Sequence, residues 1–136
     1  LHKLDKNIKT RQENFQKQCD FFAKYPEYFE NPIEAHGINT AWLAFPLLVK
    51  KNAPFERTDF QIYLEKHNIQ TRVVFTGNVT RQPMLKDHEI IISKNGYPNS
   101  DAVMERGVLL PLHHGLTEEM FKRFHETVDS FINQFN

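Results

Sequence analysis

Residues 107–135, GVLLPLHHGLTEEMFKRFHETVDSFINQF, carry the two patterns that decide the fold of this chain. The apolar run 107–112 is typical of a buried strand, and the turn after it leads into a helix. Thr117 is expected to cap that helix, with Glu118 and Glu119 in its first turn. The remainder of this helix is predicted from one apolar stripe at helical spacing. The stripe consists of Leu116, Met120, Phe121, Phe124, Val128, Phe131, Ile132 and Phe135.

Residues 1–26 are predicted to form a long linking helix, because apolar side chains recur there at three- and four-residue steps or their sums. Pro26 and Pro32 bracket an aromatic and acidic connector, in which proline prevents the helix from continuing. We therefore expect a linker or turn over residues 25–32. The predicted apolar face of the helix consists of Leu1, Leu4, Ile8, Phe15, Cys19 and Phe22.

Three further elements are predicted between the connector and residue 75. The continuously apolar stretch 40–49 indicates a buried strand, in which Pro46 predicts an edge position or a bulge. Helical spacing over residues 57–67 predicts a second helix, which Asn68 would end in the left-handed conformation. The β-branched content of residues 69–75 predicts another strand.

The 136 residues have the size of a single domain. We expect an α/β body over residues 40–136, with a short mixed or antiparallel sheet covered by helices. The run 89–92 could add an edge strand. The chain opens at Leu1 without an initiator Met and already inside a helical pattern, which indicates a piece of a longer protein.

Composition excludes several classes of function. With 17 basic and 17 acidic residues, the chain lacks the basic excess that usually drives nucleic-acid binding. Its five glycines are too widely spaced for a dinucleotide-binding or P-loop phosphate cradle. Cys19 cannot form an internal disulfide, and no segment has the pattern of a signal peptide or a membrane span. A cytoplasmic location is the default expectation.

The densest polar segment is TRVVFTGNVTRQP, at residues 71–83. Arg72 and Arg81 offer planar guanidinium groups suited to carboxylate or phosphate oxygens, and Phe75 could stack on a flat ring. Asn78 tolerates a tight turn after glycine. The alternative is an ordinary loop whose arginines pair with local acids.

His113 and His114 precede the last helix, where backbone donors collect anions. They could contact a substrate or simply pack or face solvent. A zinc site is disfavoured, because adjacent histidines point apart and no metal-binding partner motif lies nearby. Cys19 is interpreted as a small core residue rather than a nucleophile.

Four motifs together resemble a known family. They are the segment 71–83, PNSDAVM at 98–104, GVLLPL at 107–112 and GLTEE at 115–119. These residues resemble the C-terminal domain of the DegT/DnrJ/EryC1/StrS family of sugar aminotransferases and dehydratases. The GN-x-x-RQP segment is most similar to the nucleotide-sugar 3-dehydratases of deoxysugar and lipopolysaccharide biosynthesis. With the first helix and residues 42–49 also in the expected places, the resemblance covers essentially the whole chain.

The resemblance implies the small C-terminal domain of a fold-type I enzyme, packed on a larger N-terminal domain that this chain lacks. Pyridoxal 5'-phosphate or pyridoxamine 5'-phosphate would lie in that large domain. The chain alone is therefore expected to be inactive, with no catalytic, cofactor-binding or metal-binding residue. The implied parent is a homodimer that acts on a nucleotide sugar, without a nucleic-acid or membrane partner.

The expected substrate contacts are Arg72, Phe75, Asn78, Arg81, His113 and His114. In this reading the parent is a 3-dehydratase, with an aminotransferase as the alternative. Two other readings are a non-catalytic α/β binding module and a nucleic-acid module, which the neutral charge disfavours. If a large domain is missing, part of the phenylalanine surface and of the first helix should be exposed as an apolar patch.

Overall fold

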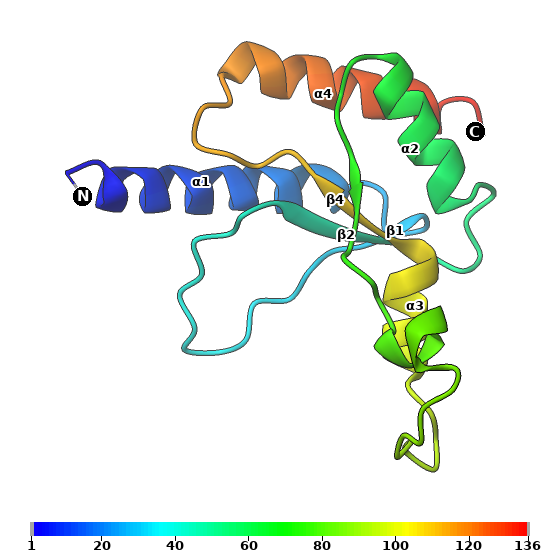
Figure 1. The fold of residues 1–136 in the computed structure, drawn as a ribbon. Helices are drawn as coiled ribbons and strands as arrows, with labels where there is room; N and C mark the ends of the chain where they lie inside the picture. Colours follow the sequence, from blue (N-terminus) through cyan, green and yellow to red (C-terminus); the bar gives the residue numbers. More distant parts are fainter. Residues whose placement is uncertain (1, 136) are drawn as a thin grey trace.

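The computed structural model describes residues 2–135, and Figure 1 shows their fold. Helices and strands are interspersed along the chain, with β2 following β1 directly, and two short 3-10 helices lie between β3 and α3. The elements are α1 Leu4–Phe22, β1 Phe29–Glu30, β2 Phe45–Val49, α2 Arg57–Lys66, β3 Arg72–Val73, η1 Val79–Arg81, η2 Pro83–Leu85, α3 Pro98–Arg106, β4 Gly107–Leu110 and α4 Glu118–Ile132.

The described strands form one antiparallel sheet in the order β1-β2-β4-β3. This confirms the predicted α/β class, and the sheet is antiparallel rather than mixed. Along β2 the side chains alternate between buried and half-buried, as period-two geometry requires. Pro46 faces Leu109 of β4, whereas β1 pairs only with Leu48 and Val49. Proline therefore lies where β2 has a strand on one side only, as predicted.

The aromatic core fills the space between the sheet and the helices α1, α2 and α4. Helices α2 and α4 lie over one face of the sheet in Figure 1. Phe22 and Phe45 stack with 5.6 Å between ring centroids, and Phe60 meets Phe131 at 5.3 Å. Most of the C-terminal stripe is buried in this core. Much of that stripe is therefore covered by this chain itself, whereas Met120 and Phe135 remain exposed.

Helix α1 buries Phe15 and Phe22 of the predicted face, and its buried surface also extends to neighbouring residues outside that face. Leu4 is exposed, Phe21 is buried, and two polar residues, Asn14 and Gln18, lie inside the protein. Their side-chain amides donate to backbone carbonyls just after β4, Asn14 to His113 at 3.1 Å and Gln18 to Pro111 at 3.2 Å. These bonds satisfy the carbonyls where β4 ends, which is why polar residues occupy this face. Leu1 lies outside the described residues.

Three boundaries differ from the sequence prediction. The predicted connector contains β1, and the predicted strand 40–49 begins only at residue 45. The strand expected over residues 69–75 is limited to β3, because Phe75 has a positive φ of 46° and turns the chain. Asn68 (φ 58°) and Thr117, whose side chain accepts from the Met120 amide, end α2 and cap α4 as predicted.

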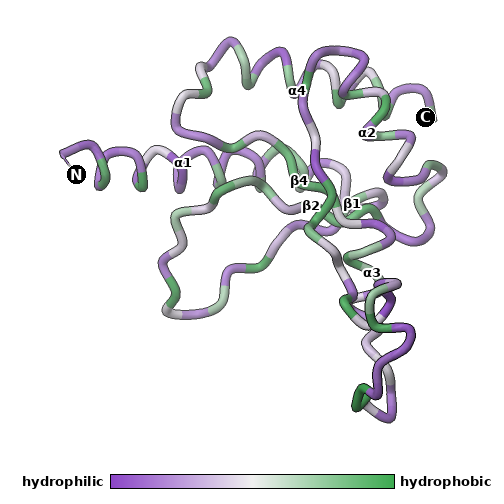
Figure 2. The backbone as a smooth tube through the Cα atoms, in the orientation of Figure 1, coloured by the Kyte–Doolittle hydropathy of each residue, from purple (hydrophilic) through white to green (hydrophobic). Residues whose placement is uncertain are grey.

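The prediction of an edge strand at residues 89–92 is wrong. This segment has no strand partner, and Ile91 is 99% exposed. Without a neighbouring strand, β-branched residues have no ladder to join. The segment belongs to an arm that projects from the sheet before α3, and Figure 2 shows a hydrophobic stretch near its tip. Helix α3 has no counterpart among the predicted elements.

Candidate functional site

The loop after β3 is a tight turn followed by η1. Phe75 and Gly77 both have positive φ, and the Phe75 ring is 81% exposed. The Asn78 side-chain oxygen accepts from the backbone amide of Thr80 at 3.0 Å and from its hydroxyl at 2.7 Å. Asn78 therefore caps η1 and is only 3% exposed.

Asp101 of α3 connects this loop to the helix. Its Oδ1 accepts from Asn78 Nδ2 at 2.7 Å and from Arg81 Nε at 3.0 Å, and its Oδ2 accepts from Arg81 Nη2 at 2.9 Å. Hydrogen bonds from Arg81 and then Asn78 lower the pKa of Asp101, and the bond to Asp101 raises the pKa of Arg81. The carboxylate thus stays ionised while it holds both side chains.

A close contact completes this arrangement. Gly77 has a φ of 62°, and a Cβ at this position would overlap Met104 of α3. Only glycine allows the loop to approach the helix so closely. We refer to Gly77, Asn78, Arg81, Asp101 and Met104 as the loop cluster.

A second site lies between β3 and α4. A cavity of about 410 Å³, here termed the β3–α4 cavity, brings together Arg72, His113 and Arg123 over an apolar lining, with no acidic residue in it. Arg123 is oriented by a bond from its Nη2 to the His67 carbonyl at 2.8 Å. Two cations without an acidic neighbour favour an anionic ligand with an apolar part.

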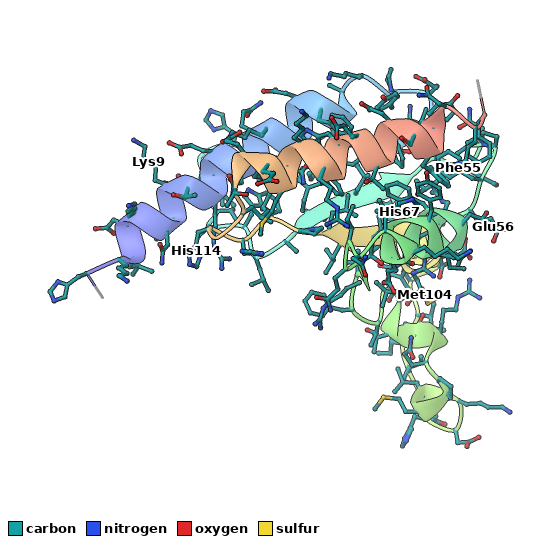
Figure 3. The ribbon with its side chains drawn as sticks, turned by 90° about the horizontal axis from the view of Figure 1, so that it is seen from above. Lys9, Phe55, Glu56, His67, Met104 and His114 are labelled. Atoms are coloured by element: carbon teal, nitrogen blue, oxygen red, sulfur yellow. The ribbon has the colours of Figure 1, made fainter. Side chains whose placement is uncertain are left out.

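The six predicted contacts therefore fall into separate groups. Asn78 and Arg81 meet in the loop cluster, Phe75 projects from the same loop, and Arg72 and His113 line the β3–α4 cavity. His114 is exposed and does not line this cavity. Figure 3 shows His114, on the loop before α4, well apart from Met104 of the loop cluster.

Asp101 and Arg123 are polar residues of these sites that sequence reasoning missed. Asp101 lies within the PNSDAVM motif, which contributed to the family resemblance but did not indicate a role for any of its residues. Arg123 is on the polar side of the α4 stripe and resembles any solvent-facing arginine. Its place in the cavity depends on how α4 crosses the sheet, which spacing along the chain does not reveal.

Another cavity, of about 840 Å³, surrounds the start of α2 and contains none of the predicted contacts. Glu56 and Asp59 form a capping box there, so the first amides of α2 are satisfied by the chain itself. The lining mixes basic residues with three acidic ones, Glu56, Asp59 and Glu105. This mixed charge gives the second cavity no clear preference for an anion.

Cys19 is half-buried, and burial raises the pKa of its thiol to about 11. A protonated thiol is a poor nucleophile, in agreement with the interpretation of Cys19 as a packing residue. Within residues 2–135 there is no group of three or more His, Cys, Asp or Glu side chains placed to hold a metal ion. Across the same residues no helix combines the length and apolarity needed to cross a membrane.

Comparison with known proteins decides the family. A sequence model described as the DegT/DnrJ/EryC1/StrS aminotransferase family matches residues 1–129. The chain belongs to this family. The resemblance drawn from the motifs is therefore confirmed.

Two curated proteins of deoxysugar and lipopolysaccharide chemistry are similar to this member of the family. A dTDP-4-dehydro-2,6-dideoxy-D-glucose 3-dehydratase from Saccharopolyspora spinosa is 29% identical over 101 residues, which cover 74% of this chain and 22% of the dehydratase. The lipopolysaccharide biosynthesis protein RfbH of Salmonella typhimurium is 24% identical over 119 residues, which cover 88% of this chain and 27% of RfbH. The chain spans about a quarter of the length of these relatives.

Solved structures show the same fold in enzymes of two kinds. The GDP-4-keto-6-deoxy-D-mannose-3-dehydratase of E. coli, solved with bound hydrated PLP, matches with a TM-score of 0.77 at 23% identity, over 93% of this chain and 32% of that chain. An aminotransferase from Psychrobacter cryohalolentis matches with a TM-score of 0.84 at 18% identity, over 99% of this chain and 37% of that chain. The predicted fold, that of the small domain of fold-type I PLP-dependent enzymes, is thereby confirmed.

Proposed function

We propose that the chain is the C-terminal part of a PLP- or PMP-dependent nucleotide-sugar 3-dehydratase of deoxysugar or lipopolysaccharide biosynthesis. The observation that carries this proposal is the 29% identity to a dTDP-sugar 3-dehydratase across 74% of the chain. The similarity to RfbH and the GN-x-x-RQP segment support the same choice. An NDP-sugar aminotransferase is the second candidate, because aminotransferases have the same fold at equally low identity.

Within that parent, the chain would line the side of the active site that receives the nucleotide sugar. The predicted contacts are Arg72, Phe75, Asn78, Arg81, His113 and His114. Exposure of Arg81 and Phe75 on the loop after β3 supports this role, as does the absence of acidic side chains around Arg72 in the β3–α4 cavity. The Asn78 side chain is bonded within the protein, so its part would be to shape the loop.

The β3–α4 cavity does not fit the cofactor. It contains neither a lysine that could link to a pyridoxal aldehyde nor a carboxylate that could face the pyridine nitrogen. In the proposed parent, the missing large domain would hold PLP or PMP, which supplies the electron sink for chemistry at the sugar carbons. The residues of this chain would bind and orient the substrate, and no reaction step is assigned to them.

The test uses the complete protein that carries this chain. It would be incubated with the cofactor, glutamate and a series of nucleotide-linked 4-keto-6-deoxy sugars, and the products analysed by mass spectrometry and NMR. We expect a 4-keto sugar that has lost its C3 hydroxyl. A product with an amino group in place of the keto oxygen would instead show an aminotransferase and overturn the proposal.

The same assay tests the predicted contacts. Arg72→Ala and Arg81→Ala should each raise the substrate KM or lower kcat by about tenfold or more, since each removes a charge-assisted bond to the anionic substrate. Lys122→Ala, on the exposed side of α4, is the control and should behave as the wild type. Unchanged kinetics for both arginine variants would remove these two residues from the site.

A further inference from the structure

We propose that Asp101 is a positioning residue, which holds the Arg81 guanidinium in place to bind an anionic group of the nucleotide sugar. The inference rests on the proposed function, because it assumes that Arg81 contacts the substrate. It assigns a role to the PNSDAVM motif, to which the sequence alone gave none. Asp101 would not touch the substrate and would act only through Arg81.

The geometry gives Asp101 this role because it occupies one edge of the guanidinium and leaves another edge available. The carboxylate accepts from Nε and Nη2 of Arg81 at 3.0 and 2.9 Å. An arginine has five N–H donors in a rigid plane, so the two on Nη1 remain for a ligand. No bond from Arg81 Nη1 to residues 2–135 is present, and the side chain is 62% exposed.

The Asp101 carboxylate is itself held in place by the helix and by Asn78, so it can fix the orientation of the Arg81 guanidinium. It lies in the first turn of α3, and its Oδ1 also accepts from Asn78 at 2.7 Å. The contact between Gly77 and Met104 holds the loop against the same helix. The guanidinium is thus oriented before a ligand arrives, which reduces the side-chain entropy lost on binding.

The segments 77–81 and 101–104 meet only because the chain returns to the loop through α3. Exposed ion pairs of this kind contribute little to folding stability. Three hydrogen bonds at one half-buried carboxylate are more than an ordinary surface pair requires. An arrangement that fixes an exposed cation fits ligand recognition better than it fits stabilisation.

The experiment compares variants of the complete protein in the substrate assay. Asp101→Asn keeps the size of the side chain and an oxygen for Asn78 but loses the charge and the second acceptor for Arg81. We expect its KM to rise about tenfold, with a smaller change in kcat. In an Arg81→Ala background, adding Asp101→Asn should raise KM no further, because the residue through which Asp101 acts is gone. Additive effects of the two substitutions would overturn the proposal.

Arg81→Lys provides a test that does not alter Asp101. Lysine keeps the charge but cannot form the two-bonded fork, so its KM should approach that of Arg81→Ala. Wild-type kinetics for Arg81→Lys would show that the fork is unnecessary. Glu126→Gln is the matched control, since it removes one acid from an exposed ion pair on α4, and its KM should not change.

Failure of this inference and failure of the proposed function are separate outcomes. If Arg81→Ala raises KM while Asp101→Asn leaves it unchanged, Arg81 binds substrate without help from Asp101, and only the positioning role is lost. If Arg81→Ala itself has no effect, the substrate contact at Arg81 fails and the positioning role fails with it. Product analysis decides the reaction class independently of both.

Discussion

The aromatic core and the loop cluster are held together by different kinds of contact. In the core, rings such as Phe22 and Phe45 pack with 5.6 Å between centroids, and apolar burial makes few demands on direction. In the loop cluster, a few polar bonds of fixed direction meet at Asp101, with one glycine in close contact. Folding free energy is therefore concentrated in the core, whereas the directional bonds of the cluster fix the geometry of the loop that carries the proposed substrate contact.

The largest effect is expected from Phe45→Ala. Phe45 is fully buried between α1 and the sheet, so truncation should lower the free energy of unfolding by about 3–5 kcal/mol through lost burial and an unfilled cavity. Urea denaturation measures this loss. Phe75→Ala is the matched control, because the exposed ring of Phe75 should contribute little stability. Equal losses at the two positions would contradict the division between core and loop.

A smaller loss is expected when the loop cluster is forced apart. Gly77→Ala combines a left-handed backbone with an overlap against Met104, and should cost about 3 kcal/mol of unfolding free energy. Gly96 has nearly the same φ, 63° against 62°, but a Cβ added there would meet no atom within 4 Å. Gly96→Ala should therefore cost only the backbone part, about 1–2 kcal/mol.

Thermal or urea unfolding of the two glycine variants gives the comparison directly. A loss for Gly77→Ala no greater than for Gly96→Ala would show that the contact with Met104 is not close in solution. In the substrate assay, Gly77→Ala should also raise KM, because displacing the loop moves Arg81 away from Asp101.

The core could be predicted from sequence because its signal is local and repeated. The stripe in α4 spans four turns, and β2 and β4 are nearly continuous apolar runs, so a few exceptions do not hide the pattern. Strand β1, with two residues, carries too little pattern to detect. The arm at 89–92 has the composition of a strand, but a strand also needs a partner, and composition does not supply one.

The loop cluster could be predicted only in part. Gly77, Asn78 and Arg81 lie within five residues of one another, so their pattern alone predicts a polar loop that could bind a ligand. Asp101 lies twenty residues from Arg81, and α3 must fold before the two can meet. Two of the buried polar residues, Asn14 and Gln18, escaped prediction for the same reason, since the carbonyls they bond are more than ninety residues away.

The smallest of these effects concerns His125, a titratable group at the border of the aromatic core. Its ring stacks on Phe21 with 3.8 Å between centroids, and its Nε2 bonds the Gln18 side-chain oxygen at 3.0 Å. Burial lowers the pKa of His125 from 6.5 to about 4, against an opposing effect of Asp129 and with a small contribution from Lys24 and Lys17. Between these two pH values the unfolded chain binds a proton that the folded protein does not.

The contribution of His125 to the free energy of unfolding should therefore be fully present above about pH 6.5. It should fall as the pH decreases toward 4, because acid favours the unfolded state that takes up the proton. After allowance for the partial exposure of the ring, the loss attributable to His125 should be about 1–2 kcal/mol. His125→Phe keeps the stack on Phe21 and removes the titration, so its unfolding free energy should depend less on pH in this window. If the variant and the wild type have parallel profiles, His125 is hydrated in solution, and the aromatic core is more open at α1 than its packing indicates.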